Sequence, residues 1–165
     1  MKALTHCIAT FFWVGHLRPA PGTWGSLAAL PVGYGIALHG GVWGLALATL
    51  TAFALGLWAT AEETRGKADH DPSEIVIDEV VGQWIALFPV VYGAIAAGQE
   101  LHRLWPGWVT AFVFFRLFDI TKPWLIGWAD RRGDALGVML DDVIAGVFAA
   151  IVVLAAAGFA HGVLM

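Results

Sequence analysis

The stretch that decides the fold is GVMLDDVIAGVFAAIVVLAAAG, residues 137–158, in which two adjacent aspartates precede a long uncharged run. The segment that follows them, Val143–Leu164, contains no Asp, Glu, Lys or Arg. A helix needs about 20 apolar residues to cross a bilayer, and this segment is long enough. Asp141 and Asp142 are therefore predicted to lie where a membrane-spanning helix enters the bilayer.

The composition of the whole chain is also typical of a membrane protein. Of its 165 residues, 59% are hydrophobic and 13% are charged, whereas soluble domains have roughly 45–50% and about 25%. The net charge of -4 and the lack of a basic run argue against nucleic-acid binding. Cys7 is the single cysteine, which excludes a disulfide within the chain.

Other segments have a similar apolar character. Val42–Ala61 has no charged residue, and Val80–Gly98 has none either, with Pro89 as an expected kink. Pro106–Ile126 is apolar apart from three charged residues, and Ser26–Leu38 is apolar but short. We predict an all-α integral membrane bundle of about four to six helices that forms one domain, residues 1–165. The N-terminal segment is expected to be uncleaved and seated in the membrane.

The charges of the loops predict which end of the bundle faces the cytoplasm. If the long spans alternate in direction, the loops Glu62–Asp78 and Gly127–Asp142 lie at the same face. These loops hold four basic residues, Arg65, Lys67, Arg131 and Arg132. The opposite loop, Gln99–Trp105, has only Arg103. By the positive-inside rule, the shared face is cytoplasmic.

The acidic residues of the predicted helices gather at this same face, as an active site would require. They are Asp78, Glu79, Asp119, Asp141 and Asp142. Glu79 and Asp142 are followed at helical spacing by small residues, which permit close helix approach, so we expect these two to face each other. Asp78 and Asp141 would complete the site or cap their helices, and acids at a helix start also complement the helix dipole.

Carboxylates that crowd together repel one another unless a cation lies between them. Oxygen ligands suit Mg²⁺, which binds one or two carboxylates together with waters and phosphate oxygens. The six histidines are scattered without HxxxH spacing, which disfavours zinc. Glu79, Asp78, Asp141 and Asp142 are the predicted metal ligands.

Two further groups of residues are predicted to hold a phosphate. Arg116 and Lys122 flank Asp119 near the end of a helix that Lys122-Pro123 should terminate. The alternative is a buried Arg116–Asp119 ion pair that only fixes helix packing.

In PGTWGS, residues 21–26, a turn is predicted to lead into a helix. Thr23, Gly25 and Ser26 would form an anion site at the helix N-terminus, or an ordinary N-cap. In DHDPSE, residues 69–74, Asp71 is predicted to cap a helix that begins with Pro72. A solvated loop is the preferred interpretation of this stretch, and the alternative is that His70 and Asp71 assist catalysis.

Four blocks in this order resemble the bacterial phosphatidylglycerophosphatase A family. They are PGTWGSLAALP (21–31), IVIDEVVGQWIALFP (75–89), FRLFDITKPW (115–124) and GVMLDDVIAG (137–146). The resemblance implies a Mg²⁺-dependent phosphatase of the bacterial inner membrane, with its active site facing the cytoplasm. It also implies an anionic phospholipid substrate, phosphatidylglycerophosphate, whose terminal phosphate is hydrolysed to give phosphatidylglycerol. The chain departs from the family at Leu125, where proline is common, and at Asp134-Ala135, where a Gly-Gly pair is common.

The sequence excludes other phosphatase chemistries, because no CxxxxxR or DxDxT pattern occurs. Our hypothesis is in-line attack by a metal-activated water, with Asp78, Glu79, Asp119 and Asp142 as the catalytic acids. A phosphorylated aspartate is the second route. The competing class is a divalent-cation or proton-coupled carrier, whose acids would lie near the membrane midplane.

Overall fold

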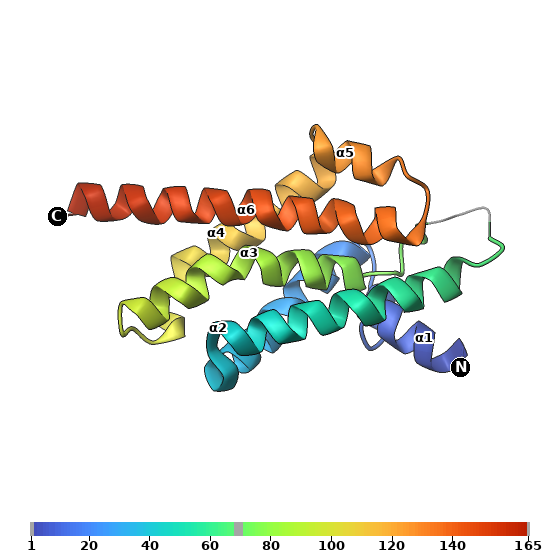
Figure 1. Cartoon of the computed structure of the whole chain (residues 1–165), viewed down its shortest axis with the longest axis horizontal. Coiled ribbons are helices and arrows are strands. Elements are labelled where there is room, and N and C mark those ends of the chain that lie inside the picture. The colour runs from blue at the N-terminus through green and yellow to red at the C-terminus, as the bar shows by residue number, and fades with distance from the viewer. Residues whose placement is uncertain (1, 68–70, 165) are drawn as a thin grey trace.

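The computed structural model describes residues 2–67 and 71–164, and every regular element in these ranges is a helix (Figure 1). The α-helices are α1 (Lys2–Ala9), α2 (Pro21–Thr64), α3 (Ile77–Ala96), α4 (Trp105–Thr121), α5 (Leu125–Asp130) and α6 (Ala135–Leu164). Two short 3₁₀ helices, η1 (Val14–His16) and η2 (Leu101–Leu104), lie between them. The predicted all-α bundle is confirmed.

Three of these helices are long and apolar enough to cross a membrane: Pro21–Thr64, Ile77–Ala96 and Ala135–Ala160. Helix α4 has 17 residues and is about 25 Å long at 1.5 Å per residue. It is shorter than the predicted segment Pro106–Ile126, because Lys122 adopts a left-handed conformation (φ 44°) and Pro123 follows it. The predicted helix end at Lys122-Pro123 is confirmed.

Helix α2 is a hairpin of two helical halves, which reverse direction at Gly41 (Figure 1). Gly41 has φ 58° and ψ -151°, a conformation that residues with a side chain rarely adopt. The predicted short helix over Ser26–Leu38 is therefore longer than expected: it begins at Pro21 and continues to the reversal at Gly41. The first half begins at Pro21, because proline is favoured at the first position of a helix, so PGTWGS forms the first helical turns rather than a preceding turn.

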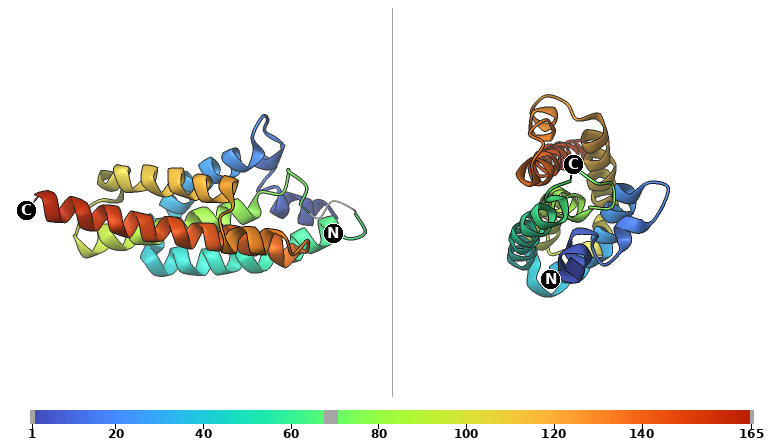
Figure 2. Two further views of the ribbon diagram at one scale, coloured as in Figure 1. Left: turned by 90° about the horizontal axis from the view of Figure 1, so that it is seen from above. Right: turned by 90° about the vertical axis from the view of Figure 1, so that its right-hand side faces the viewer.

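Helix α3 lies at the centre of the bundle, with α2, α4 and α6 packed around it (Figure 2). In its most apolar window 56% of the residues are buried, against 22% in the corresponding windows of α2 and α6. Trp84 of α3 donates a hydrogen bond from Nε1 to the carbonyl oxygen of Ala29 in α2 (2.9 Å). Helix α3 is thus buried by protein, while α2 and α6 carry much of the outer surface.

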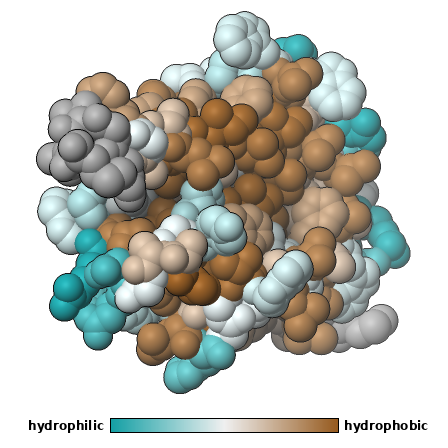
Figure 3. Space-filling model, turned by 60° about the vertical axis from the view of Figure 1, so that its left-hand side comes forward, coloured by the Kyte–Doolittle hydropathy of each residue, from teal (hydrophilic) through white to brown (hydrophobic). Residues whose placement is uncertain are grey.

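The outer surface is rich in large apolar side chains, which Figure 3 shows as a broad hydrophobic face with hydrophilic residues toward its edges. Trp43, Leu47 and Ile151 are more than half exposed. Contiguous apolar surface of this kind marks contact with lipid or with another protein. Together with the spans above, it makes the chain a helical membrane protein.

The connection into α3 differs from its prediction. Residues 71–76 form turns and bends, and α3 begins only at Ile77. The helix predicted to start at Asp71-Pro72 is therefore wrong, because Val76 instead donates its backbone N–H to the carbonyl oxygen of Ala9 (2.9 Å). His70 lies outside the described residues.

The N-terminal helix α1 has eight residues, which is far too short to cross a bilayer. It packs against α2, near the end of the bundle at which α3 and α6 begin.

Candidate active site

A cavity of about 300 Å³ opens at the end of the bundle where α2, α3 and α6 begin and α4 ends. Its lining includes six acids, Asp71, Asp78, Glu79, Asp119, Asp141 and Asp142, and two bases, Arg116 and Lys122. The acids that the sequence places at one face are therefore brought into one cavity. The excess of carboxylates over cations calls for additional positive charge.

Three of these carboxylates, from Asp78, Glu79 and Asp142, form a tight group. One oxygen of each lies within 4.8 Å of the others. Asp78 Oδ1, Glu79 Oε2 and Asp142 Oδ1 are buried, and none of them has a hydrogen-bond partner among the described residues. Buried carboxylate oxygens are costly without a donor or a cation, so this group fits a divalent metal ion that takes oxygen ligands.

Close contact between α3 and α6 brings the three acids together. Gly82 and Gly146 meet backbone to backbone, since a methyl group added at Gly146 would overlap the carbonyl oxygen of Gly82. Gly82 lies three residues after Glu79, and Gly146 lies four residues after Asp142. The prediction that small residues on these faces permit close approach is confirmed.

The two aspartates of α6 have different surroundings. Asp141 accepts a hydrogen bond from Lys122 Nζ at Oδ2 (2.7 Å) and one from the backbone N–H of Asp142 at Oδ1 (2.9 Å). Asp141 thus lies outside the three-carboxylate group, although it lines the same cavity. Asp142 faces Asp78 and Glu79, as expected of it, and Asp78 belongs to the group rather than only capping α3.

Lys122 is held between two acids at the end of α4. Its Nζ donates to Asp141 and also to Asp130 in α5. Burial alone would lower the pKa of Lys122, but the hydrogen bonds with Asp130 and Asp141 raise it well above its usual range. Lys122 is therefore a fixed positive charge at the rim of the cavity.

Arg116 forms the second cationic group. It donates from Nη1 to Asp119, three residues later on α4, and the same nitrogen lies 3.8 Å from Glu79 Oε1. Its Nε is buried and has no hydrogen-bond partner among the described residues. The guanidinium thus joins α4 to α3 and keeps one donor unused beside the cavity.

The first turn of α2 closes another wall of the cavity. A methyl group at Gly22 would overlap Glu79 Oε1 and approach Arg116 Nη1 to 3.1 Å, so a larger residue there would displace the Glu79 carboxylate from its present position. Thr23, Gly25 and Ser26 are absent from the described cavity lining. Gly25 packs against Val76, and the Ser26 hydroxyl donates to the carbonyl oxygen of Gly22 (2.9 Å).

The amino-acid sequence matches the family model described as Phosphatidylglycerophosphatase A over residues 7–157. The chain belongs to this family. It is 38% identical over 151 residues to "Phosphatidylglycerophosphatase A" of Haemophilus influenzae, which covers 91% of this chain and 86% of the relative. It is 36% identical over 148 residues to the Escherichia coli protein of the same name, covering 88% and 78%. Membership makes the chain a phosphoric monoester hydrolase of the lipid phosphatase type.

A third relative has a different name. The "Putative phosphatidylinositol-3-phosphatase" of Bacteroides thetaiotaomicron is 35% identical over 151 residues, which is 88% of this chain and 89% of that protein. No solved structure gives a significant match.

One ion-pair partner in the site is absent from the sequence-based expectation. Asp130 was not predicted, because it lies eight residues after Lys122 and only the short helix α5 folds it back. The family membership excludes the carrier alternative. The position of the acids agrees with this, since Asp78 and Glu79 lie in the first turn of α3 and Asp119 in the last turn of α4.

Proposed function

We propose that this chain hydrolyses the terminal phosphomonoester of phosphatidylglycerophosphate and releases phosphatidylglycerol and inorganic phosphate. The names of the Haemophilus influenzae and Escherichia coli relatives support this substrate. The observation that carries the proposal is the group of Asp78, Glu79 and Asp142. Its buried oxygens have no hydrogen-bond partner among the described residues, and it lines the same cavity as Arg116 and Lys122. An acid cluster of this kind suits a phosphate only when a metal ion offsets its charge.

We propose Mg²⁺ as that metal, held by Asp78, Glu79 and Asp142. The donor set is all oxygen, and the cavity of about 300 Å³ has room for a phosphate and waters as further ligands. When bound, Mg²⁺ would lower the pKa of a ligand water and offset charge on the phosphoryl oxygens. Asp141, although predicted as a ligand, is engaged by Lys122, so its proposed role is to position that lysine.

The chain's own cations would bind and orient the phosphate. Arg116 has an unused donor beside the cavity, and its planar guanidinium suits phosphate oxygens. Asp119 would fix the orientation of Arg116, and Lys122 would supply a second positive charge. The backbone N–H of Gly22, which lies in the first turn of α2 and in the cavity lining, would complete the anion site.

For Gly25 and Ser26 we propose packing rather than direct phosphate binding. Both are buried and lie off the cavity lining, and Gly25 packs against Val76, the residue before α3.

Two chemical routes fit this arrangement: direct attack by water, and transfer of the phosphoryl group to one of the carboxylates followed by hydrolysis. Trapping with hydroxylamine during a single turnover distinguishes them, because water oxygen enters the released phosphate by either route. Only the aspartyl-phosphate route passes through a hydroxylamine-sensitive phosphoenzyme, whereas direct attack by water forms none.

We further propose that the cavity faces the cytoplasm from the bacterial inner membrane. Arg65, Lys67, Arg131 and Arg132 lie in the loops at the cavity end of the bundle, while Arg103 lies in the loop at the opposite end. This distribution follows the positive-inside rule.

The test is phosphate release from phosphatidylglycerophosphate by the purified full-length protein in detergent, with Mg²⁺ and with EDTA. The variants are Glu79→Gln and Asp142→Asn. Their matched controls are Glu62→Gln and Asp134→Asn, which remove exposed or half-buried acids outside the cavity lining. We expect Mg²⁺-dependent release that is lost in both site variants and retained in both controls.

Phosphatidylinositol 3-phosphate is assayed in parallel, because one relative is named for that substrate. Preferential release from phosphatidylinositol 3-phosphate would overturn the proposed substrate. Equal phosphate release with Mg²⁺ and with EDTA would overturn the proposed metal requirement.

A further inference from the structure

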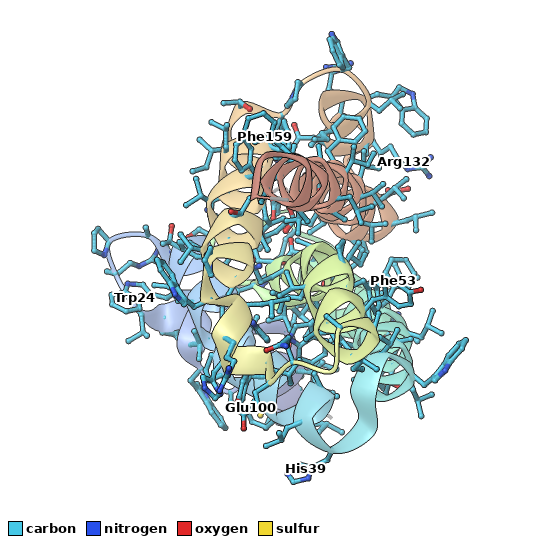
Figure 4. All side chains as sticks on the ribbon, turned by 90° about the vertical axis from the view of Figure 1, so that its left-hand side faces the viewer. Trp24, His39, Phe53, Glu100, Arg132 and Phe159 are labelled. Atoms are coloured by element: carbon cyan, nitrogen blue, oxygen red, sulfur yellow. The ribbon has the colours of Figure 1, made fainter. Side chains whose placement is uncertain are left out.

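Helices α2 and α4 both pack around α3, but among α2, α3, α4 and α6 they are the pair that packs together least. Figure 4 looks along this side of the bundle, with α4 beside the start of α2, from which Trp24 points outward. By contrast, the second half of α2 packs tightly on α3, where a methyl group at Gly56 would lie 3.0 Å from Ile77 Cγ1. We call the contact between the first half of α2 and α4 the α2–α4 seam.

The seam is closed at one end and open at the other. Away from the cavity, the rings of Tyr34 and Trp108 pack with centroids 5.6 Å apart, and Trp108 Nε1 donates to the carbonyl oxygen of Leu101 (3.0 Å). At the cavity end, the lining includes Gly22 of α2 and Ile120 of α4. Ile120 is 69% exposed, so the cavity lining continues there onto the lipid-facing surface.

Helical spacing identifies the side chains on the α2 side of the seam. Tyr34 marks the face that meets α4, and steps of four, seven and eleven residues back along the helix reach Leu30, Leu27 and Thr23. Leu27, on this face by helical spacing, is 38% exposed. The α2 wall is therefore apolar, and only its cavity end, at Thr23, is polar.

The α4 side has the same polarity. Steps of four residues from Trp108 reach Phe112 and then Arg116, which borders the cavity. Phe112 is partly buried, and Val109 and Val113 beside it are about half exposed. The seam is thus apolar along its length and cationic where it meets the acids.

We propose that the α2–α4 seam, bounded by Thr23 and Leu27 on α2 and by Phe112 and Ile120 on α4, binds the glycerol backbone and adjoining acyl segments of the phospholipid substrate. This inference rests on the proposed function and adds the path by which the lipid reaches the site. A phosphomonoester must enter the charged cavity, while withdrawing acyl chain from the bilayer costs about 0.8 kcal/mol per CH₂ group. A lateral opening that joins the cavity to lipid satisfies both requirements.

A second apolar hollow is the main competitor for the acyl chains. It has a volume of about 400 Å³ and lies between the α1 region and the second half of α2, with Ile77 and Trp84 at its base. Among the described residues, it shares no lining residue with the active-site cavity. A lipid seated there would have no direct path to the carboxylates.

The test compares two substitutions of the same kind in the full-length protein. Leu27→Trp narrows the seam, while Leu50→Trp adds the same bulk to the exposed outer face of α2, where Leu50 is 68% exposed. A third variant, Ala52→Trp, fills the competing hollow. The activity of each variant is measured with phosphatidylglycerophosphate in detergent and with the deacylated head group, glycerophosphoglycerol phosphate. The inhibition constant (Ki) of inorganic phosphate is measured as well, as an independent test of the head-group site.

For Leu27→Trp we expect kcat/KM for the lipid to fall about tenfold, chiefly through KM, because the lost contacts hold the lipid in ground and transition state alike. The deacylated substrate and the phosphate Ki should change less than about twofold, as should all readings of Leu50→Trp and Ala52→Trp. An equal loss on both substrates, no loss on the lipid, or the same loss in either control would overturn the seam as the lipid path. If the wild type hydrolyses neither substrate, the proposed function itself fails, which is a distinct result.

Discussion

The two acidic pairs of this chain, Asp78-Glu79 and Asp141-Asp142, look alike in the sequence but are used differently. Both residues of the first pair contribute to the three-carboxylate group, whereas only Asp142 of the second pair does. Asp78 and Glu79 lie in the first turn of α3, and Asp141 and Asp142 lie about two turns into α6. Adjacent side chains on a helix diverge by about 100°, and on α6 this divergence points Asp141 toward Lys122, whose Nζ donates to it.

The largest expected effect separates the two members of the second pair. Asp142→Asn should lower kcat/KM more than about a hundredfold, because it removes one of the three clustered carboxylates. This loss is larger than the usual loss when a residue that only supports a metal ligand is changed. Asp141→Asn should cost about tenfold, since it only loosens Lys122. Mg²⁺ binding by isothermal titration calorimetry provides a reading independent of turnover, and equal losses in the two variants would refute the division of roles.

The second prediction concerns the contact that brings the two pairs together. Gly146→Val should destabilise the protein by about 3 kcal/mol, because its side chain would overlap the backbone of Gly82 and push α6 from α3. The control is Gly158→Val on the same helix, where no atom lies within 4 Å of an added Cβ. Thermal unfolding in detergent measures both, and a Gly146→Val protein as stable as the control would contradict the close contact.

The third prediction sharpens the role of Asp141. Lys122→Met should destabilise the protein by about 2 kcal/mol, because it leaves a buried carboxylate without its partner. Adding Asp141→Asn removes that unpaired charge, so the double variant should be more stable than Lys122→Met alone. A double-mutant cycle of thermal unfolding gives the coupling energy, and strictly additive effects would argue against the pair.

The smallest expected effect lies at the start of α6, which positions the second pair. Asp134 accepts the backbone N–H of Gly137 (2.7 Å) and two hydrogen bonds from Arg132. The Arg132 hydrogen bonds, followed by the Gly137 bond, hold the pKa of Asp134 below its ordinary value of 3.8. Asp134→Ala should therefore cost about 0.5–1 kcal/mol at neutral pH, at the low end for a helix cap because the site is exposed.

The pH dependence of that difference follows from its sign. A carboxylate whose pKa is lower in the folded state than in the unfolded state stabilises the fold at pH values above its unfolded-state pKa. This stabilisation is lost as the pH falls through the folded-state pKa. The melting-temperature difference between wild type and Asp134→Ala should be constant above about pH 5 and shrink below pH 3. A difference that grows in acid would contradict the assignment.

Several features of the site could be predicted from the sequence because they depend on local spacing. The apolar lengths predicted the spans, the basic loops predicted a shared end, and the glycines after Glu79 and Asp142 predicted the close contact of α3 and α6. The same apolar segments predicted that the acidic residues lie at helix ends. These inferences need only the rise of a helix per residue and the rotation of about 100° per residue.

Other features could not be predicted because they depend on contacts between distant parts of the chain. The helix expected at Asp71 is absent, since Val76 bonds to Ala9, 67 positions earlier in the chain. The engagement of Lys122 by Asp130 requires α5 to fold back on α4. The placement of Gly22 against Glu79 requires α2 to reverse at Gly41.

The sequence by itself determined that this protein is a helical membrane phosphatase with acids at one end, because hydrophobic length, charge position and family blocks are all properties of the linear chain. Only the tertiary structure decided which acids meet. Asp78, Glu79 and Asp142 form the group, and Asp141 pairs with Lys122. The physical reason is that a carboxylate's partners depend on the rotation and distance of whole helices, which here are set by the backbone contact of Gly82 with Gly146.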